Sequence, residues 1–218
     1  MPPGGPLPFA ELVELIETDN ARGVEFLSPL SPWLLIDLLD VTGRRVADLF
    51  AKLPPEDRAA TNVAWADEAV SANWTDVGRE FTERWHHQMH IREAVGAPGL
   101  TSRRWIEPIL RLSVLSLRRS YAQATAEPGT TVVLRVVGSW RHEWSMVRGP
   151  HGWDLLDGAA ARPDASISMD TRTAWRSFFD FCTVAATRER VEVRGNAALA
   201  EPILNARSVM IRETISGA

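Results

Sequence analysis

The sequence is poor in cysteine and lysine. Cys182 is its only cysteine and Lys52 its only lysine. A single cysteine excludes an internal disulfide and a metal cluster built from several cysteines. Lysine and arginine together number 24 against 28 aspartates and glutamates, so the formal net charge is −4. Because no basic excess is available to neutralise phosphates, we expect no nucleic-acid partner.

Long apolar runs are also missing. No stretch of about 18 consecutive apolar residues occurs, so we expect no membrane-spanning helix. Residues 1–7 are rich in proline and glycine and lack the basic and apolar regions of a secretory signal. We therefore expect a disordered leader and a cytoplasmic protein. The hydrophobic share of 45% and the charged share of 24% are typical of a globular chain.

The first half of the sequence has helical periodicity. Apolar residues recur three and four positions apart, and the stretches are bounded by capping residues such as Ser31 and Asn73 or by proline and glycine. A proline inside such a stretch predicts a kink or a late start. The predicted helices cover residues 9–26, 33–53, 74–95 and 102–125, with Pro108 inside the last.

The second half changes to short β-branched and alternating runs separated by turns. Strands are predicted over residues 130–137, 143–147, 153–156, 164–170 and 190–194, with helices over 171–184 and 196–205. The sequence therefore predicts an α+β fold in which helices come first and mixed structure follows. The predicted parts are the leader 1–7, a helical bundle over 8–126 and a small α+β domain over 127–218.

The third predicted helix carries a cluster of histidines. At 100° per residue, Glu83, His87 and His90 form one stripe along it, with His86 beside the stripe and Trp85 on an apolar face opposite. Side chains four positions apart can reach one divalent metal, and imidazoles with a carboxylate suit zinc or another borderline ion. Histidines on a polar helical face are usually only solvated, so the spacing leaves both interpretations open.

This helix resembles the metal-ligand helix of the mycothiol-dependent maleylpyruvate isomerase family. That family belongs to the DinB-like group of metal-binding four-helix bundles. Its motif Glu-x-Trp-x-His is matched by Glu83, Trp85 and His87, and the His-x-x-x-His pair of related DinB-like proteins is matched by His86 and His90. The segments 63–66 and 99–101 also resemble actinobacterial members of the family.

The resemblance extends into the second half. Family members often carry a C-terminal module similar to sterol-carrier proteins. The segments 165–175 and 191–196 resemble that module in their order of strand, helix, strand and helix. The resemblance therefore covers most of the chain from about residue 9 onward and implies a DinB-like helical bundle followed by a sterol-carrier-like α+β domain.

The resemblance also implies a chemistry. A divalent metal, zinc in the first place, would be held by Glu83 and His87, with mycothiol as the thiol cosubstrate. The metal would keep the thiol as a thiolate that adds to a small electrophile, giving an isomerase or a thiol transferase. Arg79 or Arg84 would orient a substrate carboxylate, and ordinary surface solvation is the alternative for both arginines.

The chain departs from the family in one respect. The family has a further ligand histidine on an earlier helix, whereas no histidine precedes His86 here. We therefore expect an N-terminally shortened bundle whose metal site is incomplete unless His86, His90 or a second chain supplies the missing ligand. A shortened bundle exposes apolar faces, which favours a homodimer. The alternative function is a non-catalytic protein that binds an apolar ligand through its second half and dimerises through its helices.

Overall fold

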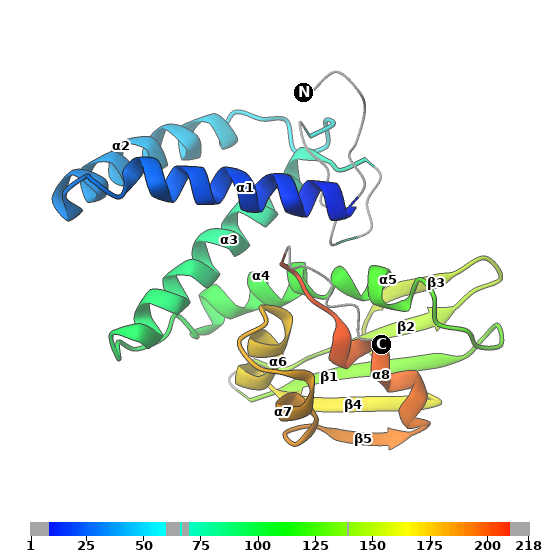
Figure 1. Cartoon of the computed structure of the whole chain (residues 1–218). Coiled ribbons are helices and arrows are strands. Elements are labelled where there is room, and N and C mark those ends of the chain that lie inside the picture. Colours follow the sequence, from blue (N-terminus) through cyan, green and yellow to red (C-terminus); the bar gives the residue numbers. More distant parts are fainter. Residues whose placement is uncertain (1–8, 60–65, 67–69, 139, 210–218) are drawn as a thin grey trace. The chain divides into compact units, whose positions relative to one another are not determined.

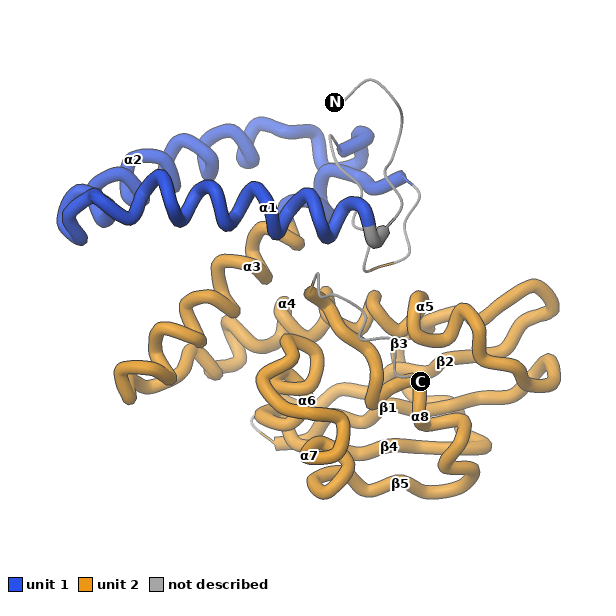
Figure 2. The backbone as a smooth tube through the Cα atoms, in the orientation of Figure 1, with its two compact units in different colours: residues 1–64, 69–77, 210–218 blue, residues 65–68, 78–209 orange. Residues whose placement is uncertain are grey.

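The computed structural model describes residues 9–59, 66, 70–138 and 140–209. The described chain divides into two compact units, coloured separately in Figure 2. The first unit contains residues 9–59 and 70–77, and the second contains residue 66 and residues 78–209. The predicted leader, residues 1–7, and most of the segment 63–66 lie outside the described residues.

The helices follow the predicted order along the chain (Figure 1). The predicted N-cap of the second helix is confirmed, because the Leu34 backbone N–H donates to Ser31 Oγ at 3.3 Å. The helices of the described chain are α1 (Phe9–Leu27), α2 (Pro32–Phe50), α3 (Asn73–Ala94), α4 (Arg103–Ser113), α5 (Ser116–Tyr121), α6 (Thr171–Phe178), α7 (Val184–Arg188) and α8 (Ala197–Asn205).

The fourth predicted helix is divided into α4 and α5. The break follows Ser113, whereas the kink was expected at Pro108, which lies inside α4. The hydroxyls of Ser113 and Ser116 donate to the carbonyls of Ile109 and Ser113, at 2.8 and 2.7 Å. Such side-chain bonds to the preceding turn compete with the backbone bonds and favour a bend.

The sheet has five strands in the order β3-β2-β1-β4-β5. The central pair β1 and β4 is parallel, and Leu134 lies opposite Ile167 in its register. The other pairs are antiparallel. Helices and a mixed sheet together confirm the predicted α+β class. The strands are β1 (Thr131–Val137), β2 (His142–Arg148), β3 (Trp153–Asp157), β4 (Ala165–Asp170) and β5 (Glu192–Gly195).

The core of the second unit lies on one face of this sheet. Leu134, Met146 and Ile167 are at most 1% exposed, and α6 and α8 contact β1 and β4. The Tyr121 hydroxyl donates to the Leu199 carbonyl at 2.6 Å and so joins α5 to α8. The helices α4 and α5, which precede the sheet in the sequence, thus belong to the same compact unit as the sheet.

The long helix predicted over residues 171–184 is interrupted. α6 ends at Phe178 and α7 begins only at Val184, and Asp180 between them has a φ of 58°. A left-handed residue cannot continue an α-helix, and here it turns the segment 179–181 back. The Phe181 backbone N–H donates to the Arg176 carbonyl at 2.8 Å. This turn places two phenylalanines, Phe179 and Phe181, beside α3.

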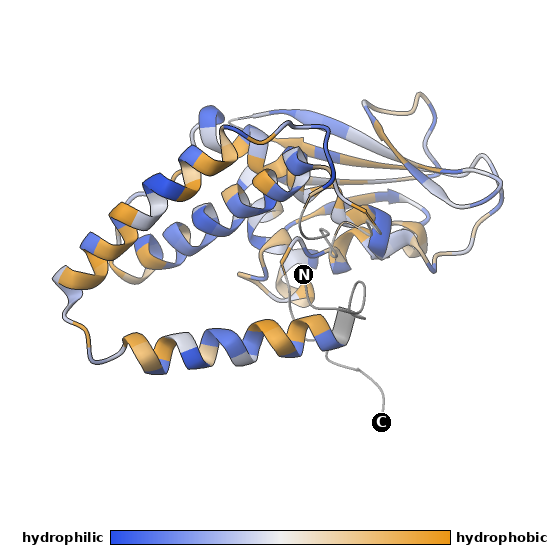
Figure 3. Ribbon diagram, turned by 90° about the horizontal axis from the view of Figure 1, so that it is seen from above, coloured by the Kyte–Doolittle hydropathy of each residue, from blue (hydrophilic) through white to orange (hydrophobic). Residues whose placement is uncertain are grey.

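The first unit exposes many apolar side chains. No described side chain of α2 is buried, and hydrophobic residues alternate with polar ones around α1 and α2 (Figure 3). Phe26 is 80% exposed and Trp33 78%. The homodimer expected from such faces stays a prediction.

None of the described helices combines the length and hydropathy that crossing a membrane requires.

The end of β5 yields a stability prediction. Gly195 has a φ of +78°, and a Cβ there would lie 2.2 Å from the Asp164 carbonyl oxygen. We expect Gly195→Ala to lower the free energy of unfolding by more than about 3 kcal/mol, because a clash with backbone adds to the strained φ. Gly129→Ala is the control, since Gly129 also has a positive φ but an added Cβ would meet no atom within 4 Å. Urea denaturation measures both, and equal losses would contradict the role of the clash.

Candidate metal centre and adjoining cavity

Aromatic packing holds α3 against the segment that contains α6. Trp85 on α3 is 3% exposed and contacts Trp175 edge to face at 5.4 Å between ring centroids. Phe179 packs on the same Trp85 ring at 5.5 Å. The indole N–H of Trp85 donates to the Leu100 carbonyl at 3.0 Å, which ties the loop after α3 to the same helix. The buried indole is thereby satisfied and fixes the rotation of α3 about its axis.

This rotation sets two histidines on the two phenylalanines of the turn. The His86 ring stacks on Phe179 at 5.3 Å, and the His90 ring stacks on Phe181 at 4.1 Å with an interplanar angle of 12°. His86 and His90 are four residues apart, so they lie on one face of α3 in successive turns. The ring of His87 lies 4.1 Å from that of His86.

The three histidines form a compact donor set. One ring nitrogen of each of His86, His87 and His90 lies within 4.8 Å of those of the other two. The carboxylate of Glu83 adjoins the set, because its Oε2 lies 3.5 Å from His86 Nδ1 and 3.6 Å from His87 Nε2. These two separations are longer than hydrogen bonds. The structure thus brings together all four residues that the sequence analysis named as candidate metal ligands.

The cluster spans the border between buried and exposed surface. The His86 side chain is 8% exposed, that of Glu83 26% and that of His87 67%. The helical spacing predicted a stripe of Glu83, His87 and His90 with His86 beside it. It did not predict that His86 is the buried residue of the four. On the apolar face expected opposite, Trp85 is buried, whereas Val95, which follows the last residue of α3, is 71% exposed.

Burial shifts the protonation of the cluster. Burial, and then the neighbouring His87 and His90, lower the pKa of His86 from its ordinary 6.5 to about 4. Burial and His87 also lower the pKa of His90. Burial raises the pKa of Glu83, although the positive charge of His87 and Arg79 opposes the rise. The histidines with lowered pKa are neutral at pH 7, which is the form that binds metals.

The residues fit a divalent ion of the zinc type. The buried Nδ1 of His86 has no hydrogen-bond partner within the part of the chain that the structure describes. An unpaired buried nitrogen costs free energy unless a proton donor or a metal satisfies it. Tetrahedral zinc requires ligand nitrogens about 3.4 Å apart, as follows from Zn–N bonds of about 2.0–2.1 Å. The His87 side chain is 67% exposed, so a change of its rotamer can cover the remaining distance.

The two candidate substrate arginines differ in their surroundings. The Arg84 guanidinium donates to Glu80 Oε1 at 2.9 Å on the exposed side of α3. Arg79 contributes positive charge to Glu83. Neither observation tests a substrate contact, so the assignment of Arg79 and Arg84 to a substrate carboxylate stays a prediction.

A cavity of about 400 Å³ adjoins the aromatic packing. Met89 of α3 and Trp175 of α6 belong to its wall, and Trp175 also packs edge to face on Trp85. This volume lies in the range of small-molecule sites. The lining residues are Met89, Glu93, Gly96, Ala97, Gly99, Thr101, Thr171, Arg172 and Trp175.

Sequence reasoning missed the partners of the histidines. Phe179 and Phe181 follow His90 by about 90 residues, and no local periodicity links them to α3. It also missed the cavity, because the cavity's wall is divided between residues 89–101 and 171–175. The one available signal was the density of phenylalanines at residues 178–181, which predicts burial but not the partner.

Comparison with known proteins gives structural likeness only. No family model matches the sequence, and no curated protein matches it. Among solved structures, sterol carrier protein 2 like 2 from Aedes aegypti shares 19% identity over 44% of this chain and 97% of its own, with a TM-score of 0.32. Sterol carrier protein 2 from Yarrowia lipolytica, in its apo form, shares 15% identity over 63% of this chain and 91% of its own, with a TM-score of 0.30. A ubiquinone synthesis protein titled UbiJ-SCP2 shares 17% identity over 45% of this chain and 93% of its own, with a TM-score of 0.31.

The lowered pKa of His86 predicts a pH dependence of stability. In the unfolded chain this histidine titrates near 6.5 and in the folded chain near 4, so between these values the unfolded state binds more protons. Stability from this source is complete above pH 6.5 and is lost as the pH falls towards 4. With EDTA present, we expect the urea midpoint to fall less between pH 7 and 5 in His86→Phe, which keeps the stack on Phe179.

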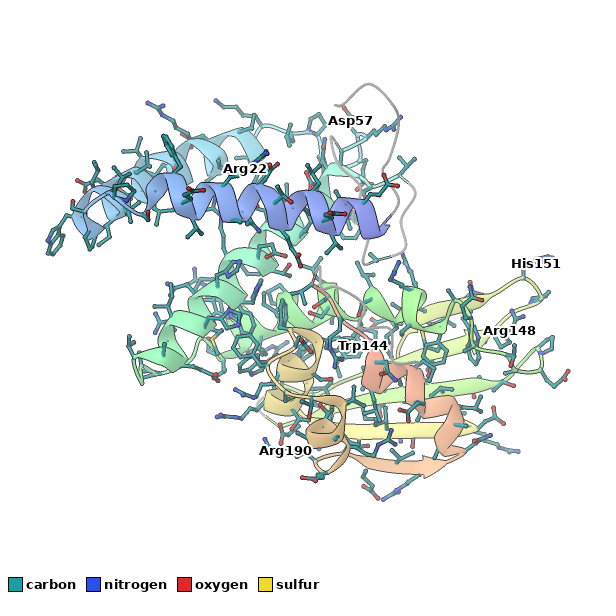
Figure 4. The ribbon with its side chains drawn as sticks, in the orientation of Figure 1. Arg22, Asp57, Trp144, Arg148, His151 and Arg190 are labelled. Carbon is teal, nitrogen blue, oxygen red and sulfur yellow. The ribbon has the colours of Figure 1, made fainter. Side chains whose placement is uncertain are left out.

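The control for this measurement is His151→Gln. His151 is exposed in the turn between β2 and β3 (Figure 4). We expect this variant to lose stability with falling pH as the wild type does. An unchanged pH dependence in His86→Phe would contradict a buried neutral imidazole at this position.

Proposed function

We propose that the protein binds a divalent transition metal, zinc in the first place, through His86, His87 and His90 on α3. The observation that carries the proposal is the gathering of three imidazole nitrogens within 4.8 Å of one another. Glu83 places a carboxylate oxygen 3.5–3.6 Å from a ring nitrogen of each of His86 and His87. Three ligands drawn from these four side chains would leave the fourth position of a tetrahedral ion open. All of these ligands lie on α3. On this proposal they replace the ligand histidine that the resembled family has on an earlier helix.

The residues around the candidate ligands also support metal binding. Phe179 and Phe181 stack on His86 and His90 and restrict their ring orientations. An ordered ligand loses less conformational freedom when the metal binds. The exposed side of His87 leaves the centre open towards solvent, as a site that exchanges an external ligand requires.

The reaction that we propose for this metal site is the activation of a thiol. A bound zinc ion lowers the pKa of a coordinated thiol and keeps it as the thiolate. On this proposal mycothiol is the thiol and a small electrophile is its partner, in an isomerase or a transferase reaction. Its support is the motif of Glu83, Trp85 and His87. Within this motif, Trp85 orients α3 through its contact with Trp175, and Glu83 and His87 would bind the metal.

Metal binding is measured by equilibrium dialysis of the purified full-length chain against zinc chloride. We expect about one zinc ion per chain. We expect His87→Ala and His90→Ala each to weaken binding at least about tenfold, since changing even a residue that only hydrogen-bonds to a metal ligand costs about 10–100-fold. Both side chains are exposed, so neither variant is expected to unfold the protein.

His151→Ala serves as the matched control, because it removes an exposed histidine outside α3. Its zinc affinity should equal that of the wild type. Failure of the wild type to bind zinc, or equal affinities in all four proteins, would contradict the metal site.

The binding of an apolar organic ligand by the second unit is the second candidate function. One observation favours it, namely the cavity of about 400 Å³ in that unit. Its wall combines the apolar Met89, Ala97 and Trp175 with polar or charged side chains, namely Glu93, Thr101, Thr171 and Arg172. Small-molecule sites likewise combine apolar surface with placed polar groups. This function needs no metal and is compatible with a non-catalytic protein.

A further inference from the structure

Four apolar residues of α2 form an exposed face along the helix. Leu34, Leu38, Val41 and Leu49 lie within about 80° of one another around the helix axis, at 100° per residue. Each of them is between 43% and 56% exposed. These four residues are the α2 face. The half-buried apolar side chains of the helix lie on a different side of it: Leu35, Val46 and Phe50.

The apolar surface of the first two helices is large enough for a protein interface. Eleven of the 19 residues of α2 are apolar, and a helix that is apolar around most of its circumference is normally buried. The exposed apolar side chains of α1 and α2 present on the order of 1,000 Å², at roughly 150–250 Å² for a whole large side chain. The largest apolar patch of a typical monomer is about 300–600 Å², and a standard interface covers about 800 Å² of each partner.

The second unit offers little apolar surface that could cover the α2 face. Its exposed large hydrophobic side chains, within the part of it that the structure describes, are Ile91, Val95 and Leu156. By contrast, α1 and α2 expose eleven such side chains (Figure 3). Among the described surfaces, the one that best complements the α2 face is therefore the same face of another copy.

The charges of the two helices disfavour a lipid surface as the partner. α1 carries five acidic residues and one basic residue, and α2 carries three acidic and two basic residues. Helices that lie on membranes are usually rich in lysine and arginine on the polar face, because anionic lipids attract basic segments. The acidic excess of α1 and α2 therefore favours a protein partner.

Two charged residues of α2 favour an antiparallel pairing with a second copy. Asp37 and Arg45 form no ion pair with any residue that the structure describes. Asp37 precedes Val41 by four residues and Arg45 follows it by four. When two α2 helices pair antiparallel about a two-fold axis at Val41, Asp37 of each copy lies level with Arg45 of the partner subunit. A parallel pairing instead sets Asp37 level with its own copy, which brings like charges together.

We propose that the protein forms a two-fold symmetric dimer in which the α2 faces of two copies pack antiparallel. The dimer buries the four residues of the α2 face, and Asp37 pairs with Arg45 of the partner subunit on both sides of the axis. No residue of the histidine cluster or of the cavity wall belongs to this surface. The inference is therefore independent of both proposed functions.

The mass of the full-length protein in solution tests the dimer. Sedimentation equilibrium is measured over about a hundredfold range of concentration, because dimerisation follows mass action. We expect the mass to approach twice the chain mass of 24.2 kDa. Leu38→Lys should weaken the dimer about hundredfold or more, because each copy then buries an unpaired charge. The matched control is Leu156→Lys, the same substitution at a position of β3 that is 50% exposed, and it should leave the mass unchanged.

Charge exchange tests the antiparallel arrangement. Asp37→Arg and Arg45→Asp should each weaken the dimer about tenfold, because each replaces two ion pairs by two contacts of like charge. The double variant Asp37→Arg/Arg45→Asp should regain the affinity of the wild type, because the pairs form again with their signs exchanged. Both residues are exposed, so these variants are expected to fold, and circular dichroism checks their helix content.

Three outcomes would overturn the proposal. The first is a monomer at every concentration; a loss of stability in Leu38→Lys but not in Leu156→Lys would then show that the second unit of the same chain covers the α2 face. The second is a dimer that Leu38→Lys leaves unchanged, because its interface would lie elsewhere. The third is a double charge variant that dimerises as weakly as the single variants, because the antiparallel pairing would then be wrong.

Discussion

The contact between Trp85 and Trp175 is the constraint on which the candidate site depends. The two indoles meet edge to face, and both are almost fully buried. Large aromatic side chains contribute much of the free energy gained by burial in a core, and their rings pack in preferred relative orientations. Once Trp85 is fixed, the rotation of α3 is fixed as well. His86 then faces the turn that follows α6, and His87 faces solvent.

The same contact links the two candidate sites. Trp175 packs against the helix that carries the histidines and also lines the cavity. Met89 lies one turn beyond Trp85 on α3 and belongs to the same cavity wall. The histidine cluster and the cavity wall therefore share one aromatic support.

Local sequence patterns predicted the helices, the strands, the α+β class and the histidine cluster, because each of these depends on neighbours within a few residues. They did not predict the features that depend on distant partners. The burial of His86 comes from Phe179, about 90 residues later. The predicted helix over 171–184 failed at Asp180, where a left-handed turn is stabilised by bonds such as that from Arg207 Nε to its carboxylate at 3.0 Å. The cavity could not be predicted from any single segment for the same reason, since its wall comes from two distant segments.

The most direct test of the central claim is the position of zinc in crystals of the full-length protein grown with zinc chloride, measured by anomalous scattering at the zinc edge. Our account predicts a peak within bonding distance of nitrogens from His86, His87 and His90, with the ring of His86 still stacked on Phe179. Crystals that diffract well and show no zinc peak at α3, or a peak bound only by residues outside it, would contradict the assignment of these histidines as a metal centre.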